Sequence, residues 1–400
     1  MDSLEGLCSL PPWTYIPPNP LDNPDVTFNL LTSKYPPRPL NVVYSKASEL
    51  KPIYGDQTII PLMHGKREEI VHADNEAYIT EGYPFEFLST CGMVNRCGTK
   101  LANIDYHFEV TGPRADITTP QIPGPFNACD IASGPGGFTS YIFFRRPGSK
   151  VYGMTYDINF DQSIITNPNF TRVTGLDGGP RGDLFVSYNK FIEEVLYSNA
   201  DGYDLVTGDA GFMSVDGLLR EVSGFPLLLI ESYVGIRVCK PGGNFVVKGY
   251  ETLTESSAGL IYLLSQLFET VSIFKPITSR SYNLESYIIC KNRNMNQTLN
   301  TSIDAIIKRM LSSDKYKQFP VKLFDLPPDF VDFITRNNNL RIHMVLNSME
   351  TLKYLQETKM QADIPRVDLH KFILYLNLPP ETHYVRRTRA EHYKLEGDTN

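Results

Sequence analysis

Two lysines and two acidic residues stand at positions where they could act together on a proton. Asp209 ends the apolar run YDLVTGD, Lys248 ends NFVVK, Glu285 begins ESYIIC, and Lys100 lies upstream in NRCGTKLANID. If these runs belong to one open α/β sheet, the four side chains meet at the carboxyl ends of its strands, where such sheets have their active sites. A lysine between two carboxylates is oriented, and we expect burial to lower its pKa toward neutrality, as deprotonation of a hydroxyl group would require. Taken singly, each residue also has an ordinary interpretation as a helix cap, a surface strand end or a salt-bridge partner.

A glycine-rich stretch, Asp130 to Thr139 (DIASGPGGFT), follows a largely apolar run and precedes a run that favours a helix. Strand, tight turn and helix start form the place where open α/β sheets bind a nucleotide-like cofactor. The stretch lacks the last glycine of G-x-G-x-x-G, because position 139 is Thr, and it is not a phosphate-binding P-loop. Its Gly-Pro-Gly-Gly bend lets a ligand lie against the backbone. This suits adenosyl-methionine, which carries no phosphate, better than a pyrophosphate, and a plain structural turn is the alternative.

The runs around these groups alternate between strand-like and helix-like patterns, which predicts an α/β fold with a mostly parallel sheet. Strands are predicted at 126–131, 150–156, 203–208, 244–248, 271–274 and 285–290. Helices are predicted at 139–146, 187–198, 216–238 and 255–269, and 95–105 can form another across the carboxyl ends of the strands. The turn at 240–243 (KPGG) is expected to end a helix and begin a strand. No helix separates the last two strands, so we expect an antiparallel hairpin at one edge.

The chain divides by composition into three parts. Residues 1–85 are a Pro-rich N-terminal extension, and its first forty residues are expected to run as an arm over the surface. Residues 86–295 hold the alternating strands and helices, and 296–400 form a mainly helical C-terminal region with helices at 300–313 and 328–360.

Charge and cysteine usage narrow the class of protein. The net charge of −7 argues against a non-specific nucleic-acid coat protein. It does not exclude a local basic groove on the surface. The six cysteines form no C-x-x-C pair, so we expect reduced thiols and no metal site. The chain has no apolar run of eighteen residues and no signal peptide, which predicts a soluble intracellular protein without membrane association.

Several segments together resemble the FtsJ-like ribose 2′-O-methyltransferases, and most closely the cap-specific messenger RNA 2′-O-methyltransferases of eukaryotes and large DNA viruses. These segments are NRCGTKLANID (95–105), DIASGPGGFTSY (130–141), GGPRGDLF (178–185), DLVTGDAGFMSVDG (204–217), KPGGNFVVK (240–248) and LIYLLSQLFETVSIFKPITSRSYNLESYIICK (260–291). The resemblance implies a Rossmann-like class I methyltransferase sheet with N- and C-terminal extensions. Two departures stand out: 96–99 (RCGT) replaces small apolar residues, and Ala210 replaces a glycine.

The resemblance also implies roles for individual residues. Lys100, Asp209, Lys248 and Glu285 would be the catalytic tetrad, and Asn283 and Arg280 would contact the substrate. The residues implied to bind adenosyl-methionine are Asn95, Ala132, Ser133, Gly134, Pro135, Gly136, Gly137, Phe138, Asp183 and Asp209. No metal is required, because a sulfonium is already an activated electrophile.

The reaction that these residues favour is methyl transfer from S-adenosyl-L-methionine to a ribose 2′-oxygen of RNA, at the cap-adjacent nucleotide of mRNA. Lys248 would be the general base or the cation that stabilises the alkoxide. The alternatives are a ribosomal or transfer RNA substrate, or a silent cap-binding scaffold with the same fold. Capped RNA is the expected partner, with a capping enzyme or the transcription machinery as a further one. The expected location is the cytoplasm (host cytoplasm or virion for a viral protein), or the nucleus for a cellular cap enzyme.

Overall fold

The computed structural model describes the chain in segments separated by short gaps. These segments are 29–32, 38–72, 92–113, 121–156, 160–174, 182–212, 214–215, 218–280, 282–294, 300–312 and 314–358. Most of the predicted N-terminal arm, residues 1–28, and the chain beyond 358 lie outside the described residues.

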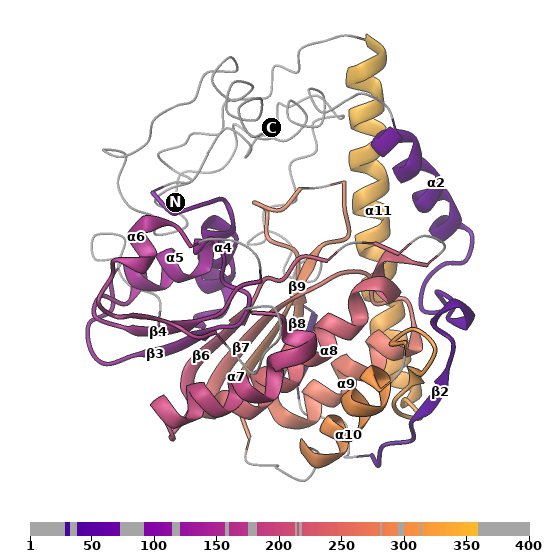
Figure 1. The fold of residues 1–400 in the computed structure, drawn as a ribbon. Coiled ribbons are helices and arrows are strands. Elements are labelled where there is room, and N and C mark those ends of the chain that lie inside the picture. Colours follow the sequence, from indigo (N-terminus) through magenta and orange to yellow (C-terminus); the bar gives the residue numbers. More distant parts are fainter. Residues whose placement is uncertain are drawn as a thin grey trace.

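A central sheet of eight described strands positions the rest of the molecule (Figure 1). From edge to edge the strands are β1 (Asn29–Thr32), β8 (Phe268–Phe274), β9 (Ser286–Arg293), β7 (Cys239–Gly249), β6 (Tyr203–Gly208), β3 (Asn127–Asp130), β4 (Lys150–Gly153) and β5 (Phe170–Arg172). Strands β5, β4, β3, β6 and β7 are parallel, whereas β9, β8 and β1 each pair antiparallel. The prediction of an α/β fold with a mostly parallel sheet and an antiparallel hairpin is confirmed.

Three details of the sheet differ from the prediction. β1 pairs with β8, so the hairpin of β8 and β9 is not the rim of the described sheet. β5 has three residues, too few for an alternating pattern to show in the sequence. The turn at 240–243 is a bulge inside β7, between the pairs Tyr203↔Cys239 and Leu205↔Asn244. Gly242 has a φ of 74°, a conformation that glycine adopts without steric cost, and this lets the strand bulge and resume.

Helices cover both faces of the sheet, and the alternation of side chains along each strand decides which layer a residue joins. Leu205 of β6 packs in one layer and Val206 in the other. On β7, Phe245 and Val247 share the layer of Val206, whereas Val246 shares that of Leu205. The layer of Val206 contains α7 (Leu184–Ser198), α8 (Arg220–Val238) and α9 (Glu255–Leu267), and the other contains α4 (Cys97–Phe108) and α5 (Gly137–Arg145).

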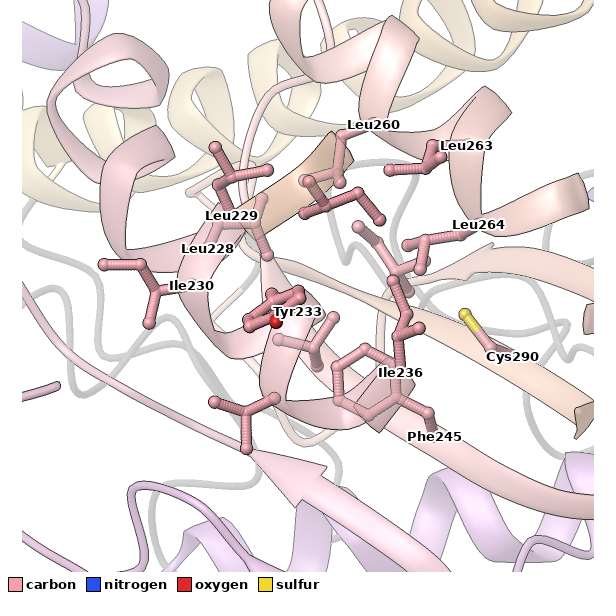
Figure 2. Packing of buried hydrophobic residues seen from close by; sticks show 14 of the residues in the cluster. Leu228, Leu229, Ile230, Tyr233, Ile236, Phe245, Leu260, Leu263, Leu264 and Cys290 are labelled. Atoms are coloured by element: carbon pink, nitrogen blue, oxygen red, sulfur yellow. The ribbon is translucent and has the colours of Figure 1, made fainter. Parts of the chain in front are cut away.

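The larger core lies between α8, α9 and the sheet (Figure 2). Leu229, Tyr233 and Ile236 follow one another at helical spacing on α8, and Leu260 and Leu264 repeat that spacing on α9. All five side chains are at most 2% exposed, and each contributes about 1.5–3 kcal/mol by its burial. This packing holds β6 and β7, and therefore the residues at their carboxyl ends, in fixed positions.

Segments from both flanks of the sequence pack together beside the sheet. α2 (Ile59–His72) lies along the long helix α11 (Pro328–Thr358), as Figure 1 shows. β2 (Val43–Ser45) pairs antiparallel with β10 (Phe319–Lys322), and α10 (Asn300–Leu311) packs on α8.

The two helices predicted in the C-terminal region are confirmed as α10 and α11. The helix predicted at 95–105 is confirmed as α4. Helix α2 has no counterpart in the prediction, because Pro61 and Gly65 interrupt its sequence pattern. The division of the chain at 85 and 295 stays a prediction. No helix in the described part of the chain is long and apolar enough to cross a membrane.

Candidate active site

A pocket opens where the glycine-rich loop leaves β3 and enters α5. It is lined by Asn95, Cys97, Asp130, Ala132, Ser133, Gly134, Gly137, Phe138 and Asp209. All but two of these are residues that the sequence indicated for the cofactor; Cys97 and Asp130 are additions. Pro135, Gly136 and Asp183 are not among the lining residues.

The loop needs its glycines for two separate physical reasons. Gly136 precedes α5 with a φ of 123°, which side-chain-bearing residues rarely adopt. Gly134 and Gly137 instead make close approaches: a Cβ on Gly134 would overlap the Thr155 hydroxyl, and one on Gly137 would overlap the Asn95 amide oxygen. The two glycines therefore let the loop backbone lie directly against Thr155 and Asn95, and Asn95 also lines the pocket.

One ion pair of the predicted tetrad spans the carboxyl ends of β6 and β7. Lys248 Nζ lies 3.0 Å from Asp209 Oδ1 and donates to the Asp209 main-chain oxygen at 3.0 Å. The two side chains are 10% and 9% exposed. Asp209 also lines the pocket, so this pair connects the glycine-rich loop with the rest of the tetrad.

The second ion pair joins α4 to the start of β9. Lys100 Nζ lies 2.7 Å from Glu285 Oε1, and the Ser279 hydroxyl donates to the same oxygen at 2.6 Å. Lys100 is 7% exposed and sits in the first turn of α4, the helix that also begins beside the pocket. All four tetrad residues therefore lie at one end of the sheet, as the sequence predicted.

Tyr287 links the two pairs, although the sequence did not single it out as a site residue. Its hydroxyl donates to Asp209 Oδ1 at 2.8 Å, and Lys100 Nζ lies 5.9 Å from its ring centroid. Tyr287 is opposite Lys248 in the β7–β9 register. The sequence could have indicated Tyr287 as a site residue, because it follows Glu285 by two positions and residues i and i+2 of a strand share one face.

Burial and charge oppose each other on the four tetrad groups. Burial alone would lower the pKa of Lys248 and Lys100, but the paired carboxylates outweigh it and raise both pKa values. Burial alone would raise the pKa of Asp209 and Glu285, but the ammoniums hold both pKa values below their ordinary range. The expected lowering of a lysine pKa toward neutrality is therefore wrong: each lysine lies against a buried carboxylate, which favours its charged form.

Two further buried carboxyl groups adjoin the tetrad. Burial raises the pKa of Asp130 to about 6, although its oxygens accept from the hydroxyls of Thr139 at 2.7 Å and Thr207 at 2.8 Å. Burial also raises the pKa of Glu231 to about 8, despite the nearby Lys248 ammonium. Asp130 stands in the quoted DIASGPGG segment, whereas Glu231 lies in the middle of α8, where no sequence signal marks it.

The structure places the other predicted site residues in two loops. Asp183 caps α7 by accepting from the Phe185 N–H at 2.9 Å, and Gly182 before it lies against Thr155, which the glycine-rich loop also touches. Asn283 and Arg280 lie between β8 and β9, in the loop that ends at Glu285. Their contacts with cofactor or RNA stay predictions. Within the described residues no three His, Cys, Asp or Glu side chains are grouped in a way that could hold a metal ion.

The chain is similar in sequence to known methyltransferases. The chain is 30% identical over 339 residues to cap-specific mRNA (nucleoside-2′-O-)-methyltransferase 1 of Dictyostelium discoideum, covering 75% of this chain and 43% of that protein. It is 28% identical over 316 residues to the human protein of the same name, covering 71% and 38%. The chain thus spans less than half the length of these relatives.

Among solved structures, human methyltransferase-like protein 13 in complex with SAH matches with a TM-score of 0.30 and 12% identity, over 54% of this chain and 87% of that one. The family model of the FtsJ-like methyltransferases matches residues 93–293, half of the chain, and this range contains the whole tetrad and the pocket. The chain belongs to the FtsJ-like methyltransferase family.

Proposed function

We propose that this chain transfers a methyl group from S-adenosyl-L-methionine to the ribose 2′-oxygen of the cap-adjacent nucleotide of mRNA, converting cap 0 to cap 1. The observation that carries the proposal is the double role of Asp209, which lines the glycine-rich pocket and pairs with Lys248 at 3.0 Å. A methyl donor in the pocket and a hydroxyl beside Lys248 would then meet at one carboxylate.

The residues around the pocket suit adenosyl-methionine. The part of the loop that lines the pocket (Ala132 to Gly134, Gly137 and Phe138) carries no cationic side chain for a phosphate, and Asn95 adds an amide to the lining. Asp183 would reach the adenosine part with the carboxylate oxygen that does not cap α7. When bound, the cofactor supplies a methyl carbon already activated by the sulfonium.

The tetrad residues supply charge and orientation. The ribose 2′-oxygen forms a bond to the methyl carbon while the carbon–sulfur bond breaks, and the electron pair stays on sulfur. The hydroxyl proton would pass to the Asp209 carboxylate, since the Lys248 ammonium beside it has no lone pair to accept it, and then to solvent. Because its pKa is raised, Lys248 enters the reaction as an ammonium, so we assign it stabilisation of the developing alkoxide in preference to general base catalysis.

Capped mRNA as the substrate is supported by the names of the relatives, which are cap-specific mRNA (nucleoside-2′-O-)-methyltransferases. A capping enzyme or the transcription machinery would supply this RNA. The location of the protein would follow its substrate: the nucleus for a cellular enzyme, the host cytoplasm or a virion for a viral one.

The test is incubation with labelled adenosyl-methionine and two RNAs of one sequence, one capped and one uncapped. We expect label only in the capped RNA, at the 2′-oxygen of its first transcribed nucleotide. Equal labelling of both RNAs would favour a ribosomal or transfer RNA methyltransferase. Binding of capped RNA without transfer would identify a silent cap-binding subunit instead.

A further inference from the structure

The loop between β8 and β9 carries three groups of the candidate site, and one lysine holds both of its ends together. Ser279, Asn283 and Glu285 belong to this loop, and Lys275 follows the last residue of β8 directly. Lys275 Nζ donates to the Asn283 main-chain oxygen at 2.7 Å, to the Asn283 side-chain oxygen at 3.1 Å and to the Glu285 main-chain oxygen at 3.1 Å. The family tetrad does not include this third partly buried lysine.

These contacts determine how the Asn283 amide is turned. Its Oδ1 accepts from Lys275 Nζ and, at 3.1 Å, from the Glu285 N–H. The Glu285 N–H can only donate, and so can Lys275 as an ammonium, so the reversed amide would place its NH₂ group against two donors. Oδ1 must therefore face inward, and the amide nitrogen is the atom that Asn283 offers to a ligand.

The same contacts hold Glu285 from its main chain. Its carboxylate accepts from Lys100 and Ser279, while its N–H and its carbonyl oxygen are engaged by Asn283 and Lys275. A carboxylate that orients a catalytic ammonium must keep its position within a fraction of an ångström. Lys275 supplies that restraint at the place where the loop re-enters the sheet.

We propose that Lys275 is a positioning residue: it clamps the loop so that Glu285 stays paired with Lys100 and Asn283 presents its amide nitrogen to an acceptor oxygen of the RNA. This inference rests on the proposed function and adds the chemistry of one RNA contact. The RNA group at Asn283 is then a hydrogen-bond acceptor, such as a phosphate, ribose or base-carbonyl oxygen, and a group that can only donate, such as an amino group, is excluded there.

The charge of Lys275 gives the clamp a pH signature. Burial lowers the pKa of Lys275 to about 7, although the charge of the Glu285 carboxylate acts in the opposite direction. The other charged groups that influence this pKa are Lys100, Arg341 and Glu251. Below that pH the ammonium has three N–H donors for its three acceptors. Above it the amine has two, so one of the three hydrogen bonds is lost and the loop is held less firmly.

The test compares Lys275→Met with Lys291→Met, a matched change on the same hairpin at the far end of β9. Fluorescence anisotropy of a labelled capped RNA and methyl-transfer kinetics are measured from pH 6 to pH 8. We expect Lys275→Met to weaken RNA binding by roughly ten- to a hundredfold, as expected for lost hydrogen bonds of a charged group. The wild-type KM for RNA should rise with pH through about 7, and that of Lys275→Met should not. Lys291→Met should match the wild type in both.

A second variant keeps the inference testable if Lys275→Met does not fold. Asn283→Asp retains an acceptor for Lys275 and Glu285 but removes the amide donor. We expect its melting temperature to be kept and its affinity for capped RNA to be lost. Unchanged RNA affinity and an unchanged pH profile in Lys275→Met, or retained affinity in Asn283→Asp, would overturn the clamp alone. A wild-type protein that neither binds nor methylates capped RNA would instead overturn the proposed function, and the clamp with it.

Discussion

Replacement of Lys248 by Met is the perturbation that tests the tetrad most directly. Methionine has a similar length and removes only the ammonium, so an apolar stem is kept at this position of β7. Asp209 keeps the hydrogen bond from Tyr287 and the influence of Lys100. The variant therefore isolates the charge that we assign to stabilisation of the alkoxide.

The size of the effect follows from the geometry. Lys248 Nζ lies 3.0 Å from a carboxylate oxygen of Asp209. An ammonium at the same distance from a developing alkoxide would stabilise that alkoxide by about 5 kcal/mol at an effective dielectric constant of ~20. Lys100 remains as a second cation, so part of this is retained. We expect turnover to fall by on the order of 10²–10⁴, which corresponds to ~3–5 kcal/mol in the barrier.

The assay is single-turnover methyl transfer from labelled adenosyl-methionine to capped RNA, with cofactor affinity from calorimetry. Cofactor affinity should barely change, because Lys248 is not among the residues that line the pocket. Lys240→Met is the matched control. Lys240 lies on the same strand and pairs with Asp204 of β6 at 2.6 Å, but it stands at the other end of the strand and is 39% exposed. Its loss should leave turnover at the wild-type level.

Lys248→Arg should fail as well, because the planar guanidinium differs in shape from the ammonium at a side chain that is only 10% exposed. Wild-type turnover in Lys248→Met, or an equal loss in Lys240→Met, would refute the assignment. Loss of cofactor binding together with turnover would show that Lys248 maintains the fold of the pocket and not the chemistry.

Three further changes test other parts of the site. Gly137→Ala should weaken adenosyl-methionine binding at least tenfold, ~1.4 kcal/mol by calorimetry, because the new Cβ overlaps the Asn95 amide oxygen; unchanged affinity would remove this approach from the site. Tyr287→Phe removes a hydrogen bond worth ~1.5–3 kcal/mol to the ionised carboxylate of Asp209, whose pKa should rise because the charged form loses a donor. The acid limb of the pH–rate profile should move to higher pH, and a stationary limb would contradict the contact. Asp183→Ala should cost about 1 kcal/mol of stability as a lost helix cap and raise the cofactor dissociation constant ten- to a hundredfold, whereas Asp183→Asn should restore the cap but not the affinity.

Much of the fold and site was predictable because the signals are local. The run at 203–208 marks a strand by its residue types, and the two-residue period of a strand then places Leu205 and Val206 in opposite layers. The glycine-rich loop is local in the same sense, since Gly136 and Gly137 mark a turn and a helix start by residue type alone. Parallel topology then places the carboxyl ends of β3, β6 and β7 at one edge, which brings Asp209 and Lys248 together.

Other features depend on segments far apart in the sequence, whose pairing no local pattern specifies. β1 pairs with β8 of the hairpin, and β2 pairs with β10, although most of the sequence separates the two strands of each pair. Lys100 pairs with Glu285, which lies 185 residues later in the sequence. The sequence therefore shows two lysines and two carboxylates, but it does not show which carboxylate each lysine contacts.

The residue types in the sequence determined that a buried, charge-bearing site exists at the ends of these strands. Only the tertiary structure decided the protonation state of that site. Burial and a neighbouring carboxylate shift a lysine pKa in opposite directions, and their balance depends on distances of a few ångströms. Lys248 and Lys275 are both removed from water, yet the pKa of Lys248, which lies against the Asp209 carboxylate, is raised. Lys275 contacts carbonyl and amide oxygens, and its pKa falls to about 7.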